Sequence, residues 1–193
     1  MIVSLFRNRK FLDDASLKRG LEFIQFIQKK CSGNVALIGG AAFVWYDSPR
    51  MTKGIDIASV DEMNLAPYSP TPLGYGTRWE RDGQASISIV SRGDEYRELY
   101  HDAVRCAIPG FSGFPVARPE HLAAMKLAIH DLRHRLDLKW LLGRKGLLDR
   151  EMLRGIVYRF VGGRFAVDAL ELVEEEVRVD IEADPDRDRN SYP

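Results

Sequence analysis

The segment spanning residues 35–58 constrains the fold of this chain more than any other, because a glycine pair separates signals for a strand and a helix. Residues 35–38 are a short apolar run, Gly39 and Gly40 follow, and residues 41–46 have helical propensity. Paired glycines at such a junction let the backbone pass close to a bound group, and a new helix offers unpaired N–H groups to a phosphate. Taken alone, the glycines are better explained as a tight turn without a ligand.

A second strand is predicted shortly after this helix, and it carries an acidic side chain. Residues 47–49 read as a loop, and residues 54–58 then alternate apolar residues with small or acidic ones. Asp56 is therefore expected on a strand. Because positions i and i+2 of a strand share a face, Gly54 and Asp56 are expected to point the same way.

The order of these features resembles the minimal nucleotidyltransferase superfamily, and within it most closely the abortive-infection nucleotidyltransferase toxins and their relatives. In that family an Asp-x-Asp pair holds magnesium against a nucleoside triphosphate. Here Gly54 stands at the first acidic position, and only Asp56 matches. The resemblance implies a magnesium-binding and catalytic role for Asp56. It also implies nucleotide binding by Gly39, Gly40, Arg50, Thr52 and Lys53.

A third family carboxylate lies on a later strand, and it is also replaced here. Residues 84–90 alternate a polar face with an apolar one. On the polar face, Ser88 falls where the family has its aspartate, and the resemblance therefore implies that Ser88 contacts the nucleotide. Two of the three metal-binding acids are thus absent. The carboxylates near the strand ends that are candidates to substitute are Asp61, Glu62, Asp94 and Glu95.

The resemblance continues in residues 116–128, where a Pro-Glu helix start precedes an Ala-Met-Lys-Leu core. Pro119 suits the first turn of a helix. The apolar residues predicted for one face of this helix are Leu122, Met125, Ile129, Leu132 and Leu136. Lys126 lies on or beside that stripe, where a lysine must snorkel or meet an anion. The resemblance assigns it a catalytic role toward nucleotide phosphates or an active-site acid, whereas Asp137 is expected to support the helices.

These patterns predict an α/β (α+β) nucleotidyltransferase fold, with a small mixed sheet flanked by helices. The expected organisation is a nucleotidyltransferase-like domain over residues 1–145, a helical extension over 146–179 and a disordered tail over 180–193. A helix is expected over residues 15–30. Residues 66–76, rich in Pro, Gly and Tyr, are expected to form an irregular loop.

The overall charge of the chain limits the kinds of partner that it can attract. The 193 residues carry 28 basic and 28 acidic side chains, so no overall field favours nucleic acid or a membrane surface. An RNA contact would need a local basic patch. The candidates for that patch are Arg133, His134, Arg135, Lys139, Arg144 and Lys145, with Trp140 for stacking. A solvated helix face explains these cations better, since Asp131 and Asp137 help to neutralise them.

The chain is expected to be cytoplasmic. Its two cysteines have no metal-ligand spacing, the N-terminus soon becomes basic, and no apolar run is long enough to span a bilayer.

Three hypotheses about function remain open. The favoured one is a nucleotidyltransferase-fold protein that binds a nucleotide or a partner with weak or no transferase activity. The first alternative is an active magnesium-dependent enzyme, toxin-like, that transfers a nucleotide to RNA or protein. The second alternative is a non-enzymatic interaction module, which exposed tryptophans at Trp45, Trp79 or Trp140 would support. Its partner could be a protein such as an antitoxin.

Overall fold

The computed structural model describes residues 26–27, 34–49, 52, 54–61, 63, 65, 69–80, 86–110, 113–129 and 131–183. Internal contacts divide the chain into two compact units, Met1–Ala117 and Arg118–Pro193. The helix expected over residues 15–30 lies outside the described residues except for Phe26 and Ile27, which are helical. The expected domain boundary at residue 145 stays a prediction.

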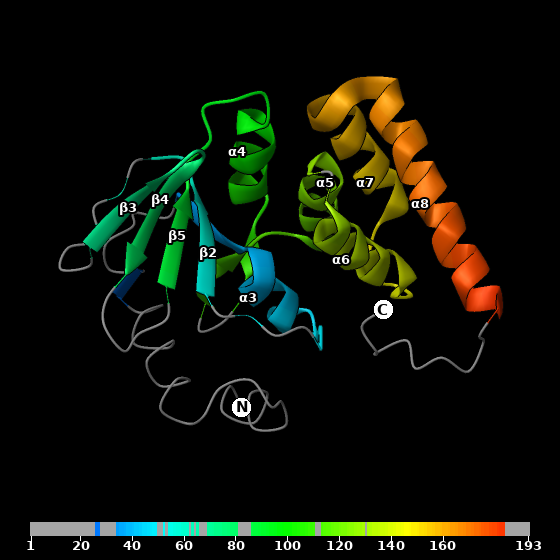
Figure 1. Cartoon of the computed structure of the whole chain (residues 1–193), viewed down its shortest axis with the longest axis horizontal. Coiled ribbons are helices and arrows are strands. Elements are labelled where there is room, and N and C mark those ends of the chain that lie inside the picture. Colours follow the sequence, from blue (N-terminus) through cyan, green and yellow to red (C-terminus); the bar gives the residue numbers. More distant parts are fainter. Residues whose placement is uncertain are drawn as a thin grey trace. The chain divides into compact units, whose positions relative to one another are not determined.

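The first unit is built on a mixed seven-stranded sheet in the order β3-β4-β5-β2-β1-β7-β6. Figure 1 shows β3, β4, β5 and β2 side by side in this order. The strands are β1 (Val35–Ile38), β2 (Gly54–Ser59), β3 (Ser69–Leu73), β4 (Gly76–Glu80), β5 (Ser86–Val90), β6 (Ile108–Pro109) and β7 (Pro115–Val116). β2 runs parallel to β5 and β1 runs parallel to β7, whereas the other neighbours are antiparallel. Helices α3 (Gly39–Trp45) and α4 (Arg97–Arg105) lie against β1 and β2. The predicted mixed sheet with flanking helices is confirmed.

Alternation of side chains along the central strands sets the two faces of this sheet. Leu37, Ile57 and Ile89 occupy one row across β1, β2 and β5, and all three are fully or almost fully buried. Burial of each such side chain stabilises the fold by about 1.5–3 kcal/mol. The residues between them point to the opposite face, which therefore carries Asp56 and Ser88.

The prediction of an irregular loop over residues 66–76 is wrong for most of its length. Residues Ser69–Leu73 form β3, which pairs with β4 around a turn at Gly74 and Tyr75. β3 contains Pro70 and Pro72, but it is the edge strand of the sheet. An edge strand tolerates proline because a missing N–H there breaks no ladder to a further strand.

The second unit is helical, with α5 (Pro119–Ala128), α6 (Leu132–Gly143), α7 (Arg150–Val157), the π-helical turn η2 (Tyr158–Gly162) and α8 (Gly163–Ala183). Helix α5 packs against α6 and α7, and α8 packs against α6 and α7. The Glu120 carboxylate accepts a hydrogen bond of 2.8 Å from the backbone N–H of Asp149, which ties the start of α5 to the start of α7.

The apolar stripe predicted along one helix from Pro119 is wrong beyond Ile129, where the backbone becomes extended. Asp131 then caps α6 by accepting a 2.8 Å hydrogen bond from the backbone N–H of His134. Such a cap stabilises the start of a new helix at this position. The chain therefore begins a second helix here, although the apolar residues continue at helical spacing. Leu132, placed on the stripe by that spacing, is exposed.

Gly163, with φ of +57°, lies at the junction between η2 and α8. Helix α8 continues to Ala183, so the disorder expected from residue 180 onward is wrong up to that point. Acidic side chains of α8 pair with basic ones of α6, which stabilises this added length. No helix within the described ranges is long and apolar enough to cross a membrane.

Candidate functional site

The glycine pair is explained by two polar side chains that lie directly over it. Gly39 has φ of +58°, and a Cβ atom there would lie 2.2 Å from Oδ2 of Asp56. A Cβ atom on Gly40 would lie 2.4 Å from Oγ1 of Thr52. The Thr52 hydroxyl in turn donates a 2.9 Å hydrogen bond to the carbonyl of Gly54. The structure thus brings four of the predicted site residues, Gly39, Gly40, Thr52 and Asp56, into one cluster.

The β2–β5 ladder places Ser88 directly opposite Asp56 and Ser86 opposite Gly54. Side chains opposite each other on neighbouring strands share a face and lie about 5 Å apart at Cβ. Ser88 therefore occupies the position that the sequence resemblance assigned to a third acid. Its side chain is buried and uncharged, and it holds no carboxylate toward Asp56.

These residues do not fit the pair of magnesium ions that nucleotidyl transfer by the superfamily requires. Magnesium needs an octahedral shell of oxygens anchored by carboxylates, and in the row across β2, β5 and β4 the described residues offer one carboxylate, Asp56. The other acid on this face of β4, Glu80, is exposed at the end of that strand. The space of a side chain at Gly54 is already taken, because a Cβ atom there would lie 2.9 Å from Ser86 Oγ and 3.1 Å from the Ser86 carbonyl. Gly54 thus leaves no room for an acid without adjustment of Ser86.

The substitute carboxylates considered from the sequence do not complete the site. Asp61 accepts a 2.9 Å hydrogen bond from Asn34 and lies beyond the end of β2. Asp94 pairs with Arg92 in the loop after β5. Glu95 is exposed on that same loop, and Glu62 lies outside the described residues. Across the described part of the chain, no group of three Asp, Glu, His or Cys donors close enough to share a metal ion includes Asp56.

A residue that the sequence did not assign, Arg78, lies in the same row. Arg78 of β4 is directly opposite Ser88, so Asp56, Ser88 and Arg78 lie side by side on three neighbouring strands and share a face. The Nε atom of Arg78 is buried and has no hydrogen-bond partner among the described residues. The pairing of β4 with β5, which aligns Arg78 with Ser88, is non-local, so a local sequence pattern does not reveal it.

Arg92, by contrast, is held within the protein. Its guanidinium donates hydrogen bonds of 2.8 and 3.1 Å from Nε to the Asp94 carboxylate and lies over the rings of Tyr75, Tyr96 and Tyr100. The hydrogen bond from Arg92 lowers the pKa of Asp94, and burial raises the pKa of Tyr100. Arg92 therefore fixes the loop after β5 to α4 and the β3–β4 turn.

The other predicted catalytic residue, Lys126, lies on α5 in the second unit. Its Nζ atom is 2.7 Å from Oδ2 of Asp137 on α6, and the two side chains are 8% and 0% exposed. This pair agrees with the expectation that Asp137 supports the helices. Nearby, burial and the charge of Lys126 lower the pKa of His134, whereas its contact with Asp131 opposes that shift. Arg50 and Lys53, also predicted to bind nucleotide, lie outside the described residues.

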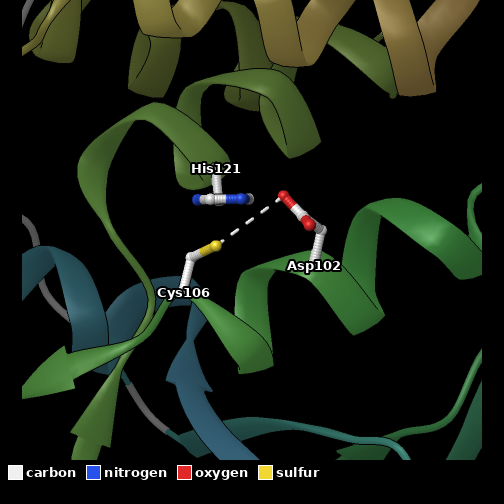
Figure 2. A group of neighbouring side chains, drawn as sticks. All are labelled: Asp102, Cys106 and His121. Atoms are coloured by element: carbon white, nitrogen blue, oxygen red, sulfur yellow. Dashed lines mark hydrogen bonds between the residues drawn. The ribbon is translucent and has the colours of Figure 1, made fainter.

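A candidate cluster of metal-binding residue types occurs away from Asp56. Figure 2 shows Asp102 on α4 and Cys106 directly after the last residue of that helix, with Cys106 Sγ 4.0 Å from Asp102 Oδ2. His121, also drawn there, belongs to the second unit, where it is fully buried on α5. Within the first unit as described, Asp102 and Cys106 provide fewer ligands than the four of a structural zinc site.

Two of the six cations in the basic patch proposed for RNA pair with acids of α8. Arg135 pairs with Glu176, and Lys139 lies 3.1 Å from both Glu176 and Asp180. Trp140 is only 4% exposed, so the prediction that it is available to stack on a base is wrong. This arrangement favours the alternative explanation of a neutralised helix face.

Comparison with known proteins gives little further information. The sequence matches no protein-family model and no curated protein. Among solved structures it is similar to the crystal structure of a "putative nucleotidyltransferase from H. pylori", with 11% identity and a TM-score of 0.49 over 89% of this chain and 98% of that chain. At this identity and TM-score we draw no conclusion about activity from the likeness. The mixed sheet, the glycine pair beginning α3 and the Asp56–Ser88 alignment fit the fold expected from the sequence.

Proposed function

We propose that this chain is a nucleotidyltransferase-fold protein that binds a nucleotide and has lost the transfer reaction. One observation carries the proposal: Asp56 lies over the glycine pair, opposite a serine rather than an acid. The close approach of Asp56 to Gly39 supports the proposal because the resemblance links this glycine turn to phosphate binding. The acids that would hold two metal ions are absent, so the protein keeps a binding surface without the means to stabilise the transferring phosphate.

Lys126 takes a supporting part in this proposal. A buried lysine that already meets a carboxylate has its charge compensated within the second unit. Its predicted role toward nucleotide phosphates stays a prediction. Thr52 has a clearer part, since its hydroxyl donates a hydrogen bond to the carbonyl of Gly54 at the start of β2.

The first test is calorimetric titration of each nucleoside triphosphate into the full chain, in EDTA and in magnesium, paired with a transfer assay using α-labelled nucleotide. We expect binding in EDTA and no label transferred to RNA or protein. Asp56→Ala should then leave the absence of transfer unchanged. Label transfer that disappears in Asp56→Ala would establish the alternative, an active magnesium-dependent transferase of the toxin type. Failure of every nucleotide to bind would refute both.

The interaction module is a second candidate because one face of α8 is apolar and exposed. Phe165, Leu172 and Val179 recur every seven residues and are 89%, 68% and 51% exposed. None of the support expected from tryptophans is found, since Trp79 and Trp140 are buried and Trp45 is half-buried. Phe165 and Val179 lie equally far from Leu172 in sequence. In an antiparallel pair of α8 helices, Leu172 would therefore meet Leu172 of a second copy, and Phe165 would meet its Val179.

The test of this second candidate is the mass of the full chain by sedimentation over a range of concentrations. A self-associating α8 gives a dimer whose dissociation constant rises strongly in Leu172→Glu. The matched control is Val161→Glu, a half-buried apolar residue in η2 outside this row. A monomer at all concentrations, or an equal effect of both substitutions, would exclude the second copy as occupant of this face.

A further inference from the structure

We infer that Arg78 supplies the positive charge for a phosphate group at this site, and that the chain therefore binds its ligand without a divalent cation. The inference rests on the proposed function, because the ligand is taken to be a nucleotide or another phosphate ester. It goes beyond that function by assigning the anion-binding residue and the metal-free mode of binding.

The first support is position. Arg78, Ser88 and Asp56 lie on the neighbouring strands β4, β5 and β2 in direct register, so their side chains leave the same face of the sheet in a row. Adjacent strands are about 4.8 Å apart, which puts Arg78 and Asp56 roughly 10 Å apart at the backbone, with Ser88 between them. A phosphate group over Ser88 would meet a hydroxyl donor and a guanidinium together.

The second support is the state of the arginine itself. Nε of Arg78 is buried and has no hydrogen-bond partner among the described residues. A buried charged donor without an acceptor is costly, and in native structures such a group usually meets a ligand, an ion or an ordered water. Guanidinium groups match phosphate oxygens by two parallel hydrogen bonds, which an isolated ammonium cannot do.

The third support is the balance of charge along the row. A magnesium-dependent site concentrates carboxylates, whereas this row holds one carboxylate, one hydroxyl and one guanidinium. A second arginine near the end of β5, Arg92, is already taken by Asp94 and three tyrosine rings. Among the described residues, Arg78 is thus the cation of this row whose Nε has no acceptor within the protein.

The experiment measures the affinity of ATP and of inorganic tripolyphosphate for the full chain by calorimetry in EDTA and again in magnesium. Arg78→Gln removes the charge and Arg78→Lys keeps it while losing the paired geometry. Arg97→Gln is the matched control, because Arg97 is an exposed arginine on α4 of the same unit. Asp56→Asn tests the sign of the neighbouring charge. Circular dichroism confirms that each variant is folded.

We expect tripolyphosphate and ATP to bind in EDTA, with magnesium giving no increase in affinity. Arg78→Gln should weaken both by about 10- to 100-fold, the range for a hydrogen bond to a charged group. Arg78→Lys should weaken them less, and Arg97→Gln should change nothing. Asp56→Asn should leave anion binding unchanged or strengthen it a few-fold, because it removes a like charge.

Two results would overturn the inference while leaving nucleotide binding in place: equal affinity in wild type and both Arg78 variants, or binding that requires magnesium and is lost in Asp56→Asn. A chain that binds neither ATP nor tripolyphosphate under either condition would overturn the proposed function together with the inference. If Arg78→Gln fails to fold, the comparison of wild type with Arg78→Lys and Asp56→Asn decides the question.

Discussion

The buried pair of Lys126 and Asp137 gives the sharpest prediction about how the second unit is held together. The two charged atoms are 2.7 Å apart, and the side chains are 8% and 0% exposed. At that separation two unit charges attract by roughly 6 kcal/mol for an effective dielectric constant of about 20. Loss of hydration offsets most of this gain, so the pair as a whole contributes little net stability.

Removal of one partner is different, because it leaves a buried charge without its counterion. We expect Lys126→Met and Asp137→Leu each to lower the free energy of unfolding by about 3–5 kcal/mol. The double substitution Lys126→Met with Asp137→Leu removes both charges. It should unfold within about 1 kcal/mol of the wild type or be more stable, which gives a coupling energy of at least about 4 kcal/mol.

The assay is equilibrium unfolding of the full chain in urea, followed by far-ultraviolet circular dichroism. An exposed ion pair of the same unit, Arg164 with Asp168 on α8, provides the control. Arg164→Met should change the unfolding free energy by no more than about 0.5 kcal/mol. A cost below about 1 kcal/mol for either single substitution at the buried pair would refute the reasoning. So would a double variant that is no more stable than the singles.

A second readout of the same pair is the pKa of His134, measured by nuclear magnetic resonance. The charge of Lys126 lowers this pKa and the charge of Asp137 raises it. Lys126→Met should therefore raise the pKa of His134, and Asp137→Asn should lower it further. Shifts of the same sign in both variants would mean that the substitutions act by rearranging α6 rather than through charge.

Two further predictions concern the first unit. Gly39→Ala should destabilise the chain by more than about 2 kcal/mol, because φ is +58° and the added Cβ would meet the Asp56 carboxylate at 2.2 Å. The control is Gly93→Ala, whose added Cβ meets no atom within 4 Å, and it should be nearly neutral in the same urea titration. Asp94→Asn should lower the thermal midpoint at neutral pH and flatten its fall in acid. The pKa of Asp94 is lowered in the folded state, so its stabilisation is present above the ordinary value of 3.8 and is lost as pH falls through the folded value. An unchanged acid profile in thermal scans would contradict this.

The elements around the glycine pair could be predicted from sequence because their signals are local. A period-two alternation identified β2 and β5, and the glycines identified the start of α3. The polar face of β5 that carries Ser88 follows from the same alternation. These signals depend on residues a few positions apart, and no distant contact is needed to read them.

The parts that could not be predicted depend on contacts between distant residues. Pro70 and Pro72 suggested a loop, and only the edge position of β3 makes them compatible with a strand. The break after Ile129 is set by the Asp131 cap, which competes with an unbroken apolar spacing. Arg78 lies beside Ser88 because β4 pairs with β5, and the sequence does not specify the register of that pairing. Non-local pairing thus decided which side chains share the functional face.

The replacement of an acid by Ser88 has a consequence for Arg78 that a single substitution can test. A carboxylate at position 88 would lie directly opposite the guanidinium and would form an ion pair with it, so the arginine would be occupied within the protein. With a serine there, the same arginine can bind an external anion.

Ser88→Asp should therefore weaken metal-free tripolyphosphate binding as strongly as Arg78→Gln does, by about 10- to 100-fold. Ser88→Ala, which removes only the hydroxyl, should weaken it by less than about tenfold. If Ser88→Asp instead leaves metal-free binding intact, Arg78 does not face the ligand. The charge of this row would then have to be balanced by a cation from solution.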